Sequence, residues 1–132
     1  MPDNSYQSKI YLRQGGDRLV EKDGAYGLTS VNAAVTAAGN SLATAKALTA
    51  ESNVVAGADN TTGVSLPAAE IGMVIFIKNT VADKVLKVYG AASGVGINAI
   101  TAGSAISMAA STGCWFFAVS ATQWYTLPLL PS

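Results

Sequence analysis

The sequence predicts a small all-β fold, an antiparallel sandwich or barrel, because short apolar runs follow one another along its second half. Six such runs recur at roughly 8–12-residue spacing, which is typical of that fold class. Gly, Asn, Pro and Ser separate them, and these are residues that turns favour. The runs are VSLP (64–67), MVIFIKN (73–79), VLKVYG (85–90), AISMA (105–109), CWFFAVS (114–120) and QWYT (123–126).

Two of these runs indicate how strands face the core. In VLKVYG (85–90), Val85, Lys87 and Tyr89 are expected on one face and Leu86 and Val88 on the other, because side chains alternate along a strand. MVIFIK (73–78) is nearly all apolar. Such a run favours a central strand covered on both faces, by the core and by a neighbouring surface.

The chain divides into three regions of different composition. Residues 1–29 are polar and are expected to form an extended N-terminal β arm, in which 9–13 and 18–21 pair across a Gly-Gly turn. Residues 30–52 are rich in Ala and Thr and predict a linker or a short helix. Residues 53–132 are predicted to be the β-sandwich body with an apolar C-terminal tail.

The tail LPLLPS (127–132) combines three leucines with two prolines. Proline lacks the N–H that regular strand pairing requires, so the tail is not expected to continue the sheet. Leu127, Leu129 and Leu130 are instead expected to dock into a groove of the same or another subunit.

The composition favours an oligomer and argues against charged partners. The 132-residue chain has eight basic and eight acidic residues, so its formal charge is zero. A neutral chain has no general attraction for nucleic acid or for anionic membranes. Only 12% of the residues are charged and 50% are hydrophobic, so part of the surface is expected to be buried against other subunits.

The residue types present do not suggest an enzyme, a cofactor or a metal. The chain contains no histidine, which removes the commonest general base and the commonest zinc ligand. Asp59, Glu70 and Asp83 fall in separate predicted turns and do not form an evident catalytic pair. Cys114 begins an apolar run without a basic neighbour, so an inert buried thiol is expected. We therefore predict no catalytic, cofactor-binding or metal-ligating residues.

Aromatic residues gather in the last two runs. Along a strand, Trp115 and Phe117 face the side opposite to Phe116, so one side is expected in the core and the other in an interface. An exposed aromatic face would also suit stacking on sugars or single-stranded nucleic acid. The absence of a basic patch disfavours nucleic acid.

Several of these segments together resemble structural proteins of tailed-bacteriophage virions, in particular small capsid decoration (cement) and head-fibre proteins. The N-terminal YLRQGGDRLVEKDGAYG resembles the lead-in of such proteins, and the similarity covers most of the chain except 30–50. The matching elements of the body are Leu66-Pro67-Ala68-Ala69, Lys78-Asn79, Val88-Tyr89, Ile97-Asn98, the small-residue run 105–110 and Trp124-Tyr125-Thr126.

The resemblance implies a jelly-roll-like β-sandwich, commonly trimeric, that sits on the capsid surface and clamps neighbouring capsomers. The expected partners are the major capsid protein and further copies of the chain. The N-terminus lacks the features of a signal peptide, so synthesis in the host cytoplasm is expected. The hypothesised capsid-contact residues of the arm are Lys9, Tyr11, Arg13 and Arg18, and those of the oligomer interface are Trp115, Phe117, Leu127, Leu129 and Leu130.

An alternative of a different class is a tail-fibre or spike module that binds host surface polysaccharide through its aromatic residues. This alternative predicts saturable glycan binding that Trp124→Ala abolishes while the fold stays intact. A hydrolase is disfavoured, because no paired acids are evident.

Overall fold

A computed structural model describes residues 10–12, 19–21 and 29–131 of the chain. Within these residues the secondary structure consists of β-strands joined by turns. The strands are β1 (Ile10–Leu12), β2 (Leu19–Glu21), β3 (Val31–Thr36), β4 (Lys46–Ala47), β5 (Ser52–Gly57), β6 (Gly63–Ser65), β7 (Val74–Asn79), β8 (Leu86–Tyr89), β9 (Gly96–Ile97), β10 (Ile106–Met108), β11 (Gly113–Ser120) and β12 (Gln123–Leu127).

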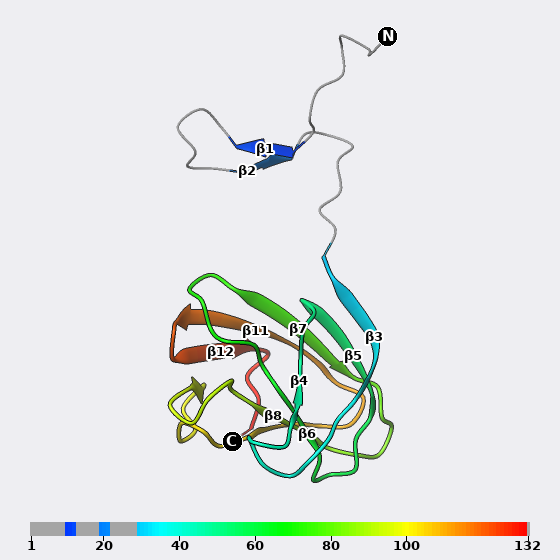
Figure 1. Cartoon of the computed structure of the whole chain (residues 1–132). Coiled ribbons are helices and arrows are strands. Elements are labelled where there is room, and N and C mark those ends of the chain that lie inside the picture. Colours follow the sequence, from blue (N-terminus) through cyan, green and yellow to red (C-terminus); the bar gives the residue numbers. More distant parts are fainter. Residues whose placement is uncertain (1–9, 13–18, 22–28, 132) are drawn as a thin grey trace, which may run out of the picture.

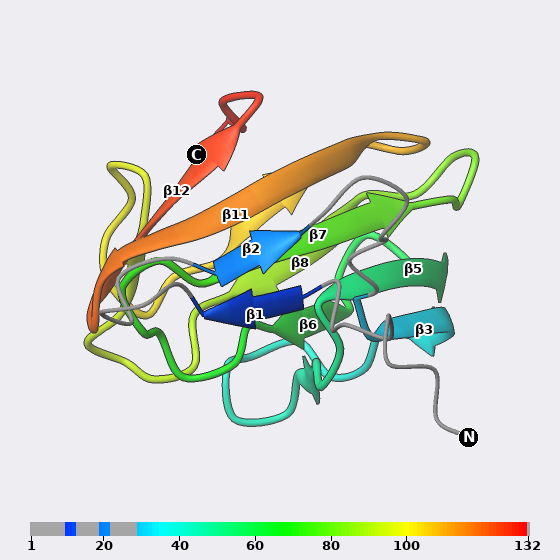
Figure 2. The ribbon, with the colours of Figure 1, turned by 90° about the horizontal axis from the view of Figure 1, so that it is seen from above.

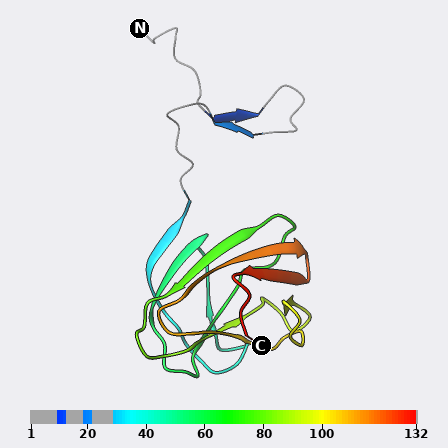
Figure 3. The ribbon, with the colours of Figure 1, turned by 180° about the vertical axis from the view of Figure 1, so that it is seen from behind.

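From β3 to β8 the chain passes back and forth between two facing sheets (Figure 1). β3, β5 and β7 lie side by side and parallel in a six-stranded sheet, while β4, β6 and β8 do the same in a four-stranded sheet. Each coil of the chain therefore adds one strand to each sheet. Figure 3 shows the same two layers from behind.

After β8, the strands of the body add to the two sheets mainly by antiparallel pairing. β10 pairs antiparallel with β8, β11 pairs antiparallel with β7, and β12 pairs antiparallel with β11. The short β9 runs parallel to β12 at the edge of the larger sheet. The fold is a mixed parallel β-solenoid of about four turns.

The all-β class is as predicted, but the antiparallel jelly-roll-like sandwich is wrong. Apart from β8 with β10, and from β11 and β12, which form a hairpin, successive apolar runs do not pair with each other, because they cross to the other sheet and pair with a strand one coil away. Alternation of side chains has the same period in parallel and antiparallel strands, so it cannot distinguish the two arrangements.

Residues 30–52 are neither a linker nor a helix. They supply β3 and β4, which form the first coil of the solenoid, and the start of β5. Alanine and threonine are small enough to fit in the turn between the two sheets. The pairing of β3 and β4 with their neighbouring strands overrides the helical propensity of the segment. Gly39 lies in this turn with φ of +63°, a conformation that glycine adopts without strain. Its backbone lies against Thr44, so a side chain at Gly39 would meet that residue.

The core lies between the two sheets. Ile75 and Ile77 of β7, Leu86 and Val88 of β8, and Phe116 of β11 all point into it and are buried. The alternation predicted for 85–89 is confirmed for Leu86 and Val88, which are fully buried, and for Val85 and Lys87, which are half-buried. Tyr89 is buried as well, so the expected alternation of exposure does not extend to it. Burial of these apolar side chains is the main favourable contribution to folding, at about 25 cal/mol per Å².

The N-terminal pairing predicted from the sequence is confirmed in the residues that the structure describes. β1 and β2 pair antiparallel, with Ile10 opposite Glu21 and Leu12 opposite Leu19. Lys9, Arg13 and Arg18 lie outside the described residues, and Tyr11 belongs to β1.

Candidate interaction face

The outer side of the six-stranded sheet is an apolar face that residues 29–131 leave uncovered. Viewed from above, β12, β11, β7, β5 and β3 run across the body in that order (Figure 2). Alternate residues of β7, β11 and β12 point outward and are more exposed than their neighbours. We define the outer face as Val74, Phe76, Trp115, Phe117, Val119, Tyr125 and Leu127.

Strand register brings these side chains together. Trp115 is opposite Phe76 on one side and Leu127 on the other, and Phe117 is opposite both Val74 and Tyr125. The rings of Phe76 and Trp115 are tilted by 49° with centroids 4.7 Å apart, and those of Phe117 and Tyr125 are 6.4 Å apart. Such tilted contacts are a favourable geometry for aromatic pairs, so the face has a defined shape.

The outer face is large for a surface in contact with water. Its side chains include Trp115 at 49% exposure, Tyr125 at 45% and Leu127 at 65%. By the usual sizes of such side chains, the uncovered apolar area is on the order of 600 Å². This is at the upper end of the largest patch on a typical soluble monomer, about 300–600 Å². Patches at this upper limit are often functional, so the outer face is the candidate interaction surface of the described residues.

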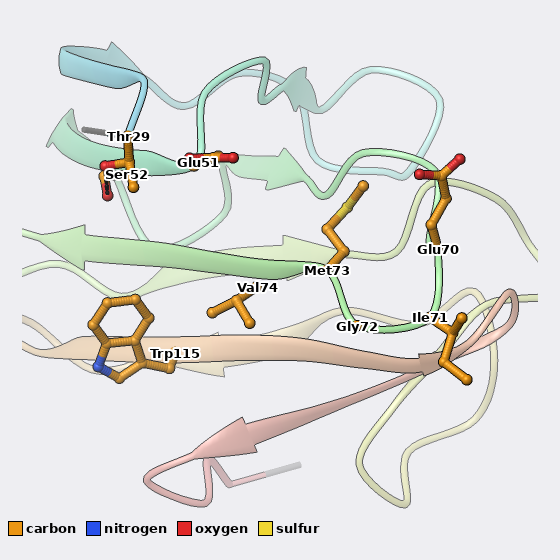
Figure 4. A pocket seen from close by; sticks show the side chains of 9 residues that line it. All are labelled: Thr29, Glu51, Ser52, Glu70, Ile71, Gly72, Met73, Val74 and Trp115. Carbon is orange, nitrogen blue, oxygen red and sulfur yellow. Dashed lines mark hydrogen bonds between the residues drawn. The ribbon is translucent and has the colours of Figure 1, made fainter. Parts of the chain in front are cut away.

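A hollow of about 550 Å³ opens beside Trp115 at one end of this face. Val74 and Met73 form apolar parts of its lining, and Glu51 and Glu70 contribute carboxylates (Figure 4). The remaining lining residues are Thr29, Ser52, Ile71 and Gly72. The carboxylates lie apart, Glu51 near Ser52 and Glu70 on the side of the hollow away from Trp115 (Figure 4). An exposed indole and separate carboxylates are suited to a cationic or a polyhydroxylated group.

The charges around the outer face are distributed unevenly along the strands. Lys78 is the last outward residue of β7, four positions beyond Val74, and its Nζ donates a hydrogen bond to the carbonyl oxygen of Ser111 at 2.7 Å. Glu70 precedes Met73 near the opposite end, while Glu51 lies beside the middle of β7, where its carbonyl oxygen accepts a hydrogen bond from the N–H of Phe76. The lysine is therefore at one end of the face, and the two carboxylates are spread between its middle and its other end.

The structure brings some of the predicted interface residues together and separates others. Trp115, Phe117 and Leu127 belong to the outer face, and Leu129 is 79% exposed just after β12. Leu130 is different, because it is buried in the core of its own chain. Leu130 is therefore not available to a second subunit.

The sequence interpretation missed two outward-facing residues of β7. Val74 and Phe76 belong to the run MVIFIK, in which nearly every residue is apolar, so hydrophobicity does not distinguish its two faces. The sequence therefore predicts a strand that is covered on both faces. Ile75 and Ile77 do face the core, but nothing in the described part of the chain covers the other side. The alternation predicted for β11, in which Trp115 and Phe117 face the side opposite to Phe116, is confirmed.

Two residues weighed as chemical candidates have ordinary structural roles. Cys114 is buried and its thiol donates to the carbonyl oxygen of Pro128 at 3.3 Å, and burial raises the pKa of this thiol. The predicted inert thiol agrees with this position. Asp59 accepts hydrogen bonds from the backbone N–H groups of Thr61 and Thr62, at 3.0 and 2.8 Å, which lower its pKa to about 2.

The lowered pKa of Asp59 links a surface turn to pH. Its folded-state pKa is below the ordinary value of 3.8, so the ionised carboxylate stabilises the fold above that pH. This contribution is lost as the pH falls through about 2. Asp59 is thus committed to the turn in which it was predicted, and β6 begins directly after this turn at Gly63.

Within the described residues, no cluster of three or more histidine, cysteine or acidic side chains has the arrangement of a metal site. No helix in that part of the chain is long and apolar enough to cross a membrane. Comparison of the chain with family models, with curated proteins and with solved structures gives no match.

Proposed function

We propose that the protein is a structural component of a phage virion that binds the outside of the capsid as a decoration protein. It stabilises contacts between capsomers and has no catalytic role. Its partners are the major capsid protein and further copies of itself. The resemblance of the segments Lys78-Asn79, Val88-Tyr89 and Trp124-Tyr125-Thr126 to such proteins supports this assignment.

The observation that carries the proposal is the uncovered outer face of the six-stranded sheet. The jelly-roll fold implied by the resemblance is not the fold of this chain, so the fold itself does not support the assignment. A contiguous apolar face is suited to a protein whose task is contact with other proteins. Many copies on one shell add avidity, so each individual contact can be modest.

The N-terminal arm, residues 1–28, is proposed to reach the shell through Lys9, Tyr11, Arg13 and Arg18. Deletion of residues 2–16 should abolish capsid binding and leave the body folded, because the buried core residues lie between 35 and 130. The measurement is co-sedimentation with capsid shells that lack the protein. Far-UV circular dichroism and the thermal midpoint of the deleted chain serve as the control for folding. Binding at full stoichiometry after the deletion would refute the arm.

A second candidate is a fibre or spike module that binds host polysaccharide, and the hollow beside Trp115 favours it. A sugar ring can stack on an exposed indole while Glu51 and Glu70 accept its hydroxyl hydrogens. The residue to test is Trp115, because Trp124 is buried in the core and cannot present a ring to a ligand.

For this second candidate, Trp115→Ala should abolish saturable binding of host polysaccharide, while Trp115→Phe should retain much of it through stacking. The measurement is isothermal titration calorimetry with purified polysaccharide. Equal binding by the alanine variant would exclude this site. Absence of binding by the unmodified chain would exclude the candidate.

A further inference from the structure

We infer that the outer face pairs with the outer face of a second copy, with the strands of the two sheets antiparallel, so that Lys78 of each copy enters the hollow of the other. This inference rests on the proposed function, in which further copies of the chain are a partner, because it specifies how two copies contact each other. It identifies the occupant of the hollow as a lysine side chain.

The uncovered area fits a partner of the same kind. A standard interface buries about 800 Å² on each partner, of which the centre is apolar and the rim is polar. The outer face supplies an apolar centre in Trp115, Phe117 and Tyr125, and a polar rim in Glu51 and Lys78. Two sheet faces of this type pack about 10 Å apart, as the two sheets of a sandwich do.

The charge distribution selects the orientation. Val74 and Lys78 are four residues apart on β7, about 13 Å at about 3.3 Å per residue. Phe76, which is opposite Trp115, lies midway between them. We place a twofold axis between the outer faces of the two copies. The axis is perpendicular to the strands and lies above this midpoint. It brings Lys78 of one copy over the Val74 end of the other. The same operation acts in both directions, so two such contacts form.

The hollow has the chemistry that a lysine side chain needs. Val74 and Met73 can cover the aliphatic stem, and the hollow offers the ammonium group two separate carboxylates, Glu51 and Glu70. The face of Trp115 adds a cation–π contact. With the strands of both copies pointing the same way, Lys78 would instead lie over Lys78 of the partner, and like charges would repel.

The experiment is a charge exchange measured by sedimentation equilibrium on the full chain. Lys78→Glu and Glu51→Lys should each weaken self-association by about tenfold or more, since each places like charges together. The double variant carrying both changes should recover most of the lost affinity, because the ion pair is restored with reversed polarity. Lys46→Glu is the matched control, since Lys46 is an exposed residue of β4 in the other sheet and its change should have no effect.

The outcomes separate this inference from the proposed function. A chain that stays monomeric, a trimer as the resemblance implies, or a double variant without recovery would each overturn the twofold pairing. Capsid co-sedimentation of the same variants tests the decoration role independently, so that role can fail while the pairing holds. Recovery in the double variant, together with a dimer as the assembled species, would establish the pairing.

Discussion

Replacement of Trp124 by alanine is expected to lower the free energy of unfolding by about 3–5 kcal/mol. Trp124 has an exposure of 0% and is the largest side chain that the core encloses. It lies on β12 opposite Ala118 of β11 and Ile97 of β9, so it connects the closing strands of the solenoid to the core. Since a small domain has a total stability of about 5–15 kcal/mol, this single change would leave little of it.

The matched control for this prediction is Trp124→Phe. The indole Nε1 is buried without a hydrogen-bond partner among the described residues, so phenylalanine removes an unsatisfied donor and retains most of the packing. Its destabilisation should be less than half that of the alanine variant in urea titrations. Equal stability of the alanine variant and the unmodified chain would mean that Trp124 is not a core residue.

Replacement of Asn79 by leucine is expected to destabilise the protein by about 2–4 kcal/mol, because buried backbone groups lose their partners. Asn79 ends β7 and is fully buried. Its Nδ2 donates to the carbonyl oxygens of Lys84 and Ala109, at 2.9 and 3.2 Å, and its Oδ1 accepts from the backbone N–H of Val81 at 3.2 Å. One side chain therefore holds the turn between β7 and β8 against the loop before β11.

The control for Asn79 is Lys84→Ala. Only the carbonyl of Lys84 takes part in this network, and its side chain forms a surface pair with Asp83 at 3.5 Å. Loss of a surface pair of this kind changes stability by less than about 1 kcal/mol. Thermal unfolding of both variants at one pH gives the comparison. A leucine variant as stable as the alanine control would show that the network does not hold the turn.

The positions of the strands could be predicted from the sequence more closely than their pairing. The runs 73–79, 114–120 and 123–126 coincide with β7, β11 and β12 to within a residue or two, because turn residues mark their ends. The pairing depends on which strand each residue meets one coil away. The pairing therefore depends on the turns between the sheets, such as the one between β3 and β4, in which Gly39 has a positive φ.

The interface residues were predictable only in part. Trp115 and Phe117 could be placed outward because Cys114, Phe116 and Ala118 alternate with them. Trp124 and Tyr125 are both aromatic, so only the partner strands decide that Trp124 is buried and Tyr125 exposed. The relation between Lys78 and the acidic residues Glu51 and Glu70 depends on the register of β5 and β7, which the sequence does not reveal.

We propose that this chain decorates a capsid, and the number of its copies in purified virions decides between decoration and a fibre. Quantitative mass spectrometry of purified particles, with the major capsid protein as internal reference, gives the copies per shell. We expect hundreds of copies, in a fixed ratio to the capsid protein, because a decoration protein occupies every equivalent site. A few to tens of copies would contradict this expectation and would indicate a fibre, and absence from the particle would contradict any virion role.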